Sequence, residues 1–426
     1  MNVNLLATSY CLFLMAQANA LTLDQALDQA IGNDKKYASA IFDARSASYL
    51  PTIGRAGLLP KLVLTGFRAN NNLTQTQADI FGNTAMAQQR YTSQSYAAQL
   101  TQPLVNLAAI ASYLQSVTQE KAAQQKLSIE FNDLRVKVID AYCAMASAQE
   151  VYADTSKELE ILVEQEKILM ARQLAGVASK IDVEEATYAR LQTQSSLDEA
   201  SSGLIQAKIS LEKLVGNVIA RSEALLMPQI SLSSSANLKQ LLAAAKDTNP
   251  KILYQKENVE SAIYENKKNK AAYMPTLDIV AYQGYQNSNS LSTVGQKSMQ
   301  GYGGLQLNIP LSTGGEIYGK EHQSAFNVES QRMLLESEMN DVEESVKKMY
   351  FQAQISTEKL STLRLQIESA NRLYISFFRQ REMGLKSTFE LLAVIRKKFQ
   401  SERELSKSAY ERIQALKKLE VAVGGF

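Results

Sequence analysis

GVASKIDVEEATYARLQTQSSLDEASSGLIQAKISLEKLVG, residues 176–216, and GLKSTFELLAVIRKKFQSERELSKSAYERIQALKKLEVAVG, residues 384–424, align without a gap at a constant offset of 208 (384 − 176). Each stretch begins with the pattern Gly-x-x-Ser and ends in Val-Gly, and both carry Ile-Gln-Ala at the same place. A gapless match over this length indicates that one structural unit occurs twice in the chain.

The match continues toward the N-terminus with a change of spacing. Pro60 pairs with Pro275, 215 positions later, and Pro103 pairs with Pro310, 207 positions later. The segment between the two prolines is therefore 8 residues shorter in the second copy (215 − 207), and such length variation is typical of a surface loop. We predict a first repeat at residues 21–216, a linker at 217–236 and a second repeat at 237–426.

Each repeat is predicted to open with a moderate helix, at residues 23–50 and 238–273, and to end with a long helical hairpin. In both hairpins apolar residues recur alternately every four and three positions, which is the a/d pattern of coiled coils. These residues are Leu127, Phe131, Leu134, Val138, Ala141, Met145 and Ala148, then Leu335, Met339, Val342, Val346, Met349 and Ala353. A helix of about 70 residues reaches roughly 100 Å, and Gly176 and Gly384 are predicted to turn the chain at the two hairpin tips.

Two strands are predicted between the opening helix and the hairpin of each repeat. They lie at residues 61–69 and 91–101, and at 276–283 and 300–309. The last one alternates most regularly, with Gly301, Gly303, Leu305, Leu307 and Ile309 on one face. Strands that are apolar on one face and polar on the other are typical of outer-membrane barrels and also of half-buried soluble sheets. The segments 70–89 and 284–299 are rich in Asn, Gln, Ser, Thr and Gly, and we expect them to be loops.

The N-terminus and the charge balance restrict the class of protein. Residues 1–20 contain an apolar core followed by Ala18-Asn19-Ala20, the pattern of a signal peptide for export. The chain of 426 residues has 45 Lys and Arg against 43 Asp and Glu, and this net charge of +2 gives no electrostatic footprint for nucleic acid. No later stretch is the charge-free run of about twenty residues that a spanning helix needs, so strands are expected to make any membrane crossing.

The number of strands then requires more than one chain. Four strands cannot close a barrel, and an open sheet edge cannot lie in lipid. Because the smallest known barrels have about eight strands, we expect the barrel to be shared between chains. Two chains would supply eight strands and three would supply twelve, and the strand count leaves both possible.

The sequence lacks residues that common catalytic and cofactor motifs require, which argues against an enzyme. His322 is the single histidine, which leaves no residues for a histidine metal cluster or a Ser-His relay. Residues 314–320 match the G-x-x-x-x-G-K spacing of a phosphate loop, but Glu321 follows where Mg²⁺ binding needs Ser or Thr. We therefore interpret residues 314–320 as a turn between a strand and a helix, and predict neither a metal nor a cofactor.

Short motifs in a fixed order along the duplicated frame carry a resemblance to a known family. They are LTLDQAL at 21–27, LLPKL at 58–62, QPL at 102–104, PLSTGG at 310–315, the two Gly-x-x-Ser tips and the terminal Val423-Gly424. In this order the chain resembles the TolC-type outer-membrane channels of tripartite efflux pumps and type I secretion systems.

The resemblance implies a mixed fold of α-helical hairpins and a β-barrel. Each duplicated unit would contribute a long coiled-coil hairpin and two antiparallel strands to a homotrimer. That trimer would have a twelve-stranded transmembrane barrel in outer-membrane lipid and a periplasmic helical tunnel. It would be a passive channel for small molecules or unfolded protein. Its partners would be a periplasmic adaptor and an inner-membrane ABC or proton-driven transporter.

The resemblance also assigns roles at the periplasmic mouth. Where relatives place two inward aspartates at the aperture, this chain has Glu390 and Ala393. The latch of the family joins an acid at one hairpin tip to a basic residue and a tyrosine at the other. Those positions are Asp182, Lys386 and Arg381, so that the tyrosine is replaced. The alternative is that Asp182 and Lys386 are simply solvated charges.

The tips themselves resemble the surface that docks the adaptor. The positions are Gly176 and Ser179 in the first hairpin, and Gly384, Leu385 and Ser387 in the second. A glycine is also needed there for any tight turn. The main alternative function is a soluble periplasmic coiled-coil adaptor or scaffold, although such a protein would normally have one hairpin flanked by β-rich domains.

Overall fold

The structure is a computed structural model, and it describes residues 21–78, 81–82, 84–219, 225, 237–290, 293–383 and 385–424. The predicted signal peptide at 1–20 and most of the predicted linker at 217–236 lie outside these residues.

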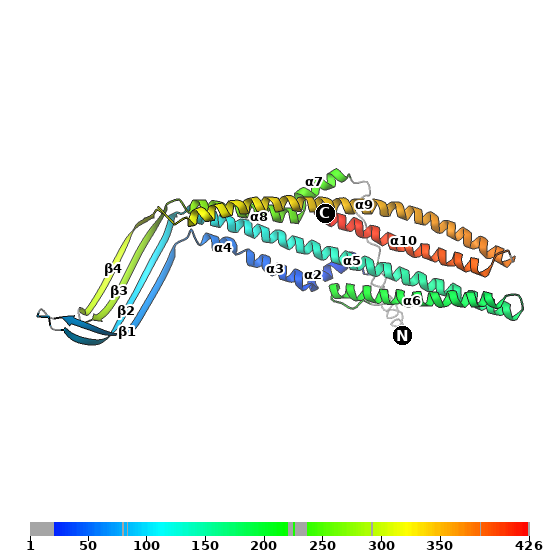
Figure 1. Cartoon of the computed structure of the whole chain (residues 1–426), viewed down its shortest axis with the longest axis horizontal. Helices are drawn as coiled ribbons and strands as arrows, with labels where there is room; N and C mark the ends of the chain where they lie inside the picture. The colour runs from blue at the N-terminus through cyan, green and yellow to red at the C-terminus, as the bar shows by residue number, and fades with distance from the viewer. Residues whose placement is uncertain are drawn as a thin grey trace, which may run out of the picture. The chain divides into compact units, whose positions relative to one another are not determined.

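Short helices, two strands and a long helical hairpin follow one another twice along the chain, with α4 as an additional helix in the first half (Figure 1). The first half contains α2 (Leu23–Asn33), α3 (Lys35–Ala47), α4 (Leu50–Arg55), β1 (Lys61–Ala78), β2 (Thr84–Val105), α5 (Leu107–Leu174) and α6 (Lys180–Val215). The second half contains α7 (Leu238–Thr248), α8 (Pro250–Ala271), β3 (Thr276–Ser290), β4 (Thr293–Asn308), α9 (Glu316–Glu382) and α10 (Thr388–Ala422). The predicted long hairpins are confirmed, with α5 and α9 running for 68 and 67 residues.

The chain divides into two compact units that do not coincide with the repeats. One, here the hairpin unit, takes the described residues up to Phe42, Gln125–Leu253 and those from Glu338 onward. The other, here the sheet unit, takes Asp43–Gln124 and Tyr254–Ser337. Each unit combines corresponding segments of both repeats, so neither repeat is a compact body by itself.

The opening helix of each repeat is broken, which corrects the prediction of single helices at 23–50 and 238–273. Asp34 separates α2 from α3, and its carboxylate accepts a hydrogen bond from the backbone N–H of Tyr37 at 2.6 Å. Asn249, at the matching position, separates α7 from α8, and its side-chain oxygen accepts from the N–H of Lys251 at 2.9 Å. Asp and Asn bond to nearby backbone in this way and favour helix starts over helix interiors.

The four strands form one antiparallel sheet in the order β1-β2-β3-β4. They continue well past the predicted ends, so most of the segments 70–89 and 284–299 is strand and not loop. Cross-strand bonds between polar side chains support the extension, from Asn71 to Ser93 at 2.8 Å and from Thr92 to Asn70 at 2.9 Å. The loop prediction was wrong because polar composition alone does not distinguish a loop from a ladder whose side chains bond one another.

The register places most leucines of the four strands on one face, here the apolar sheet face, while Val63, Phe67 and Tyr302 lie on the opposite face. Directly paired residues of an antiparallel sheet point to the same side. The register joins Leu62 to Leu100, Leu100 to Ala281, and Ala281 to Gly303. Its exposed aliphatic residues include Leu62, Leu64, Leu100, Ile279, Leu305 and Leu307, between 37% and 77% exposed. The predicted alternation of β4 is confirmed and extends across the sheet.

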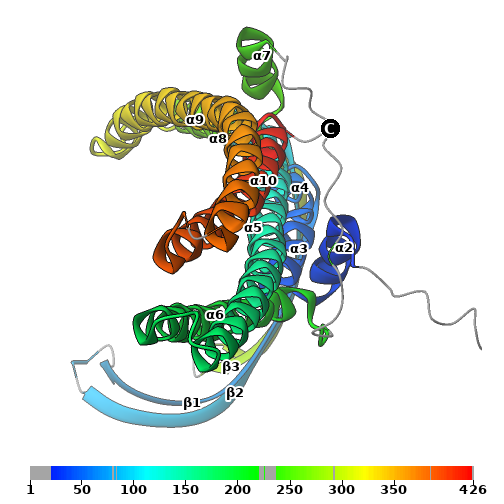
Figure 2. The ribbon, with the colours of Figure 1, turned by 90° about the vertical axis from the view of Figure 1, so that its right-hand side faces the viewer.

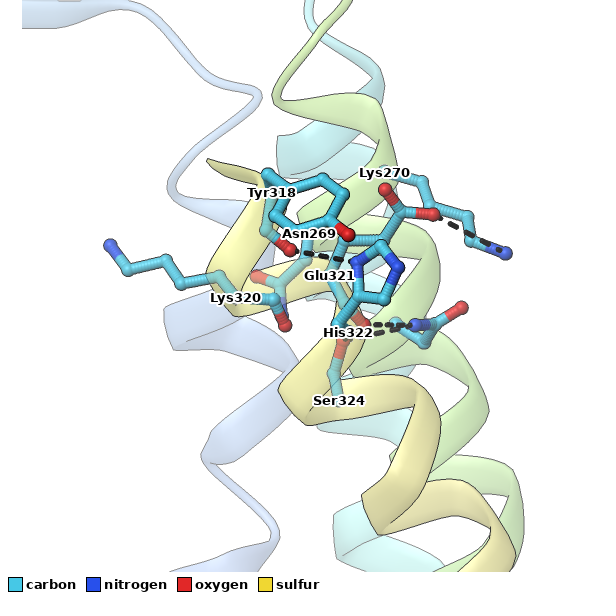
Figure 3. Close-up of polar contacts among 8 residues, drawn as sticks. Asn269, Lys270, Tyr318, Lys320, Glu321, His322 and Ser324 are labelled. Carbon is cyan, nitrogen blue, oxygen red and sulfur yellow. Dashed lines mark hydrogen bonds and ion pairs between the residues drawn. The ribbon is translucent and has the colours of Figure 1, made fainter. Parts of the chain in front are cut away.

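The sheet unit also contains the turn with phosphate-loop spacing. Gly314 and Gly315 have positive φ of 60° and 88°, and α9 begins at Glu316. The Lys320 Nζ lies 2.5 Å from a carboxylate oxygen of Glu316. The segment is therefore a turn into a helix, as predicted. Side chains of α8 and α9 meet just beyond it, with Lys270 beside Glu321 and the side chain of Asn269 donating to the Lys320 carbonyl (Figure 3).

In the hairpin unit α10 lies beside α5 (Figures 1 and 2). The predicted seam supplies its centre, since Leu134, Val138 and Met145 are at most 2% exposed. The buried Tyr142 hydroxyl donates to the carbonyl of Leu21 at 2.7 Å, which attaches α5 to the segment before α2. Across the described residues, every helix is too short or too polar to be a candidate for crossing a membrane.

Candidate functional site

The first hairpin tip joins α5 to α6 through a tight turn. Gly176 has a φ of 73°, a value that favours glycine, and the N–H of Val177 donates to the Arg172 carbonyl at 2.8 Å. Ser179 is the N-cap of α6 and forms a reciprocal capping box with Asp182. The capping box fixes the direction of the Asp182 carboxylate.

The second tip, between α9 and α10, repeats this chemistry. The N–H of Leu385 donates to the Gln380 carbonyl at 2.9 Å. Ser387 is the N-cap of α10 and forms a capping box with Glu390. Leu385 is 71% exposed, while Gly384 lies outside the described residues.

The two tips meet at Thr388, which is only 4% exposed. Arg381 Nη2 donates to its hydroxyl at 3.4 Å, and both side chains lie near the Asp182 carboxylate of the other hairpin. The Thr388 hydroxyl, the bonds from Ser179 and the nearby Arg381 charge lower the pKa of Asp182 below its ordinary value. The acid of one hairpin is thus held by a hydroxyl and a cation of the other. Thr388 was missed because a threonine beside an N-cap is no functional signal by itself.

Lys386 has a different partner. Its Nζ lies 2.6 Å from a carboxylate oxygen of Glu390 on the same tip and 4.9 Å from the centre of the Phe377 ring. The bond from Lys386, followed by that from the Ser387 N–H, lowers the pKa of Glu390. The structure therefore brings Asp182 and Arg381 to one cluster, and Lys386 and Glu390 to another. The gate role of these residues stays a prediction.

An apolar groove of about 520 Å³ lies between α6 and α10 near the tips. Its walls include Ile181, Tyr188 and Phe389, which are 70%, 66% and 64% exposed. Ala393 lies on the α10 side of this groove. Large apolar side chains at exposed positions mark a contact surface better than glycines do. The turn residues were predicted from the sequence and these three were not, although Ile181 and Phe389 each follow a capping serine by two positions.

Farther from the tips, one ion pair with a buried carboxylate joins the two hairpins and another lies within the first hairpin. Arg403 on α10 lies 2.5 Å from the carboxylate of Glu158 on α5, and Glu158 is 2% exposed. Arg190 on α6 lies 2.7 Å from the carboxylate of Glu166 on α5. Breaking a buried pair from one side leaves an uncompensated charge, so these contacts fix the helices against one another. Over the described part of the chain, no three His, Cys, Asp or Glu residues are placed to hold a metal ion.

Comparison with known proteins supports a transport role. The model of the family described as outer membrane efflux protein matches residues 26–217 and 241–425. The alkaline protease secretion protein AprF of Pseudomonas aeruginosa is 26% identical over 98% of this chain and 87% of its own length. The proteases secretion protein PrtF of Dickeya chrysanthemi is 26% identical over 96% of this chain and 89% of its own length.

Solved structures share the fold at lower identity. The CmeC outer membrane channel of Campylobacter jejuni superimposes with a TM-score of 0.80 at 14% identity, covering 95% of this chain and 85% of that one. The outer membrane protein VceC of Vibrio cholerae superimposes with a TM-score of 0.79 at 16% identity, covering 95% of this chain and 96% of that one. The resemblance to TolC-type channels is thereby confirmed.

Proposed function

The chain belongs to the outer membrane efflux protein family and is located in the outer membrane. From that premise we propose that it is the exit duct of an export system. It would carry small molecules or unfolded protein passively from the periplasm across the outer membrane. The family consists of transport channels and not of enzymes.

The exposed apolar sheet face carries this proposal. Leu305 and Leu307, which are 68% and 60% exposed, would face lipid. β1 and β4 are the edge strands of the described sheet, and lipid does not tolerate unpaired edges. Pairing of β4 with β1 of a second copy, repeated around three copies, would give a homotrimer with a closed twelve-stranded barrel. The paired hairpins would form the periplasmic tunnel.

We infer that a periplasmic adaptor docks at the tips and that an inner-membrane ABC or proton-driven transporter supplies the energy. The groove between Ile181 and Phe389 offers apolar area for the adaptor beside the turns at Gly176 and Leu385. AprF and PrtF are named as protease secretion proteins, which favours the type I secretion branch of this proposal, with a protein as cargo. The family match does not favour the alternative of a soluble coiled-coil adaptor.

The gate would be the contact between the two tips. Asp182, Thr388 and Arg381 join the hairpins, so their separation would accompany opening. Glu390 and Ala393 would line the aperture, with Glu390 as its acidic ring. Lys386 lies 2.6 Å from Glu390 and partly neutralises its charge, which would reduce any preference for cations.

The experiment places an arginine on each face of β4. Leu305→Arg would put a charge against lipid at a cost of about 2–4 kcal/mol near the bilayer centre, and it should abolish insertion and bilayer conductance. Gln306→Arg is the matched control, since Gln306 is the next residue and points to the opposite face. The unmodified protein should have the mass of a trimer in detergent. A monomer that does not conduct, or equal tolerance of both variants, would contradict the proposal.

A further inference from the structure

A polar zone lies beyond the apolar sheet face, on the same side of the sheet. From β1 to β4, the register aligns one residue of each strand in a row: Arg68, Gln94, Asn287 and Lys297. Since neighbouring strands are about 4.8 Å apart, Arg68 and Lys297 stand roughly 14 Å from one another. Both side chains are exposed.

An aromatic row separates this polar zone from the leucines. Tyr96 pairs with Tyr285, and their rings stack at 6.5 Å between centroids. Gly66 stands opposite Tyr96, where a side chain on Gly66 would lie 3.4 Å from the ring. Aromatic rings between an apolar and a polar zone are typical of a membrane interface. In the proposed barrel the cationic row lies at the level of lipid headgroups.

Amide and hydroxyl groups continue past the cationic row. Asn70 pairs with Thr92 and accepts its hydroxyl hydrogen bond at 2.9 Å, and Asn72 pairs with Arg90. Together with Gln94 and Asn287, these residues line a groove of about 840 Å³. From Gln94 to Arg90 the zone extends roughly 13 Å along β2, which is deeper than a single layer of phosphate groups.

The charge of this face is uniformly positive along the strands. Arg68, Arg90 and Lys297 are its ionisable residues, and Asp278, the only carboxylate in the four strands, lies on the opposite face. Three cations among amides and hydroxyls match a ligand that carries phosphate groups on sugars. Guanidinium and ammonium groups bind phosphate, and amides bond to sugar hydroxyls.

We propose that this zone binds the phosphorylated sugar headgroup of a glycolipid in the outward-facing leaflet. The inference rests on the proposed function, because it requires the apolar sheet face to contact lipid. Arg68 and Lys297 would bind phosphate at the membrane surface. Arg90, Asn70 and Asn72 would contact the sugars farther out, and the aromatic row would contact the region where the acyl chains begin.

The experiment measures lipid bound to the purified full-length protein in detergent. The probes are radiolabelled rough lipopolysaccharide, the same lipid after phosphatase treatment, and phosphatidylglycerol. A juxtamembrane cation contributes roughly a fivefold gain in affinity for an anionic surface. Arg68→Gln/Arg90→Gln/Lys297→Gln should therefore weaken binding of the untreated glycolipid on the order of a hundredfold. Lys61→Gln, on the opposite face, is the matched control and should leave binding unchanged.

Three outcomes would overturn the glycolipid site. They are equal binding by the triple variant, equal binding of the phosphatase-treated lipid to the unmodified protein, and equally tight binding of phosphatidylglycerol. The second and third do not depend on the folding of a variant. Bilayer conductance of the unmodified protein separates the two proposals, since a conducting trimer without bound glycolipid refutes only the headgroup site.

Discussion

The two hairpin tips share their local chemistry and differ in their partners. Ser179 with Asp182, and Ser387 with Glu390, form the same capping box 208 positions apart. Asp182 lies near Thr388 and Arg381 of the other hairpin, which lower its pKa, whereas Glu390 pairs with Lys386 of its own tip. The capping box thus orients the acid in the same way at both tips, and the residues placed around it determine whether it interacts with the other hairpin or with its own tip.

The sharpest test removes each capping acid in turn. Asp182→Ala should lose the cap of α6 and the contact between the hairpins. We expect this loss to destabilise the closed state by about 1 kcal/mol in each copy. In a trimer three copies act on one aperture, so we expect the open probability in planar bilayers to rise at least tenfold, which corresponds to 1.4 kcal/mol. Glu390→Ala loses its cap and the ion pair with Lys386 inside its own tip, but no contact between the hairpins, and should change the open probability less than about twofold. Equal effects of the two substitutions would mean that the tips are equivalent.

A charge reversal at Lys386 tests the second tip. Lys386→Glu places a like charge one turn from Glu390, and we expect a change in open probability of about twofold. The double variant Asp182→Lys/Lys386→Glu should not return to the unmodified value, because Asp182 contacts Thr388 in the structure. Restoration in single-channel recordings would show instead that Asp182 and Lys386 meet during gating.

Acid titration should give the smallest effect. The pKa of Asp182 is lowered in the folded protein, chiefly by Thr388 and Ser179, so its contribution is complete above the ordinary value of 3.8 and is lost as the pH falls through the lowered value. Conductance should therefore rise only in acid below pH 3.8. Thr388→Val removes the largest cause and should move the rise to higher pH. Glu390→Gln should leave the onset in place, and a shift of equal size there would contradict the assignment.

Periodicity alone predicted the hairpins but not the contacts between them. The a/d spacing around Val138 and Val346 follows from burial along one helix, and both residues are fully buried. The break at Asp34 depends on a backbone bond that competes with the helix. The surroundings of Asp182 depend on which residues two separate hairpins bring together. A pattern within one segment does not show which residues of another segment it will contact. The polar residues that extend β1 and β2 were predicted as loop for this reason, because their cross-strand partners cannot be seen in either segment alone.

The breaks at Asp34 and Asn249 have a mechanical consequence. The Asn33 side chain donates to the carbonyls of Lys213 and Leu214 at the end of α6, and Asn249 donates to the carbonyl of Ala422 at the end of α10. Each return helix is therefore clamped at its C-terminal end by hydrogen bonds to the opening helices, while its N-terminal part packs only within the hairpins. A rod fixed at one end bends or twists most at the other. Displacement on opening should thus grow steadily from the clamps toward the tips, and the clamps should act as the stationary anchors of that motion.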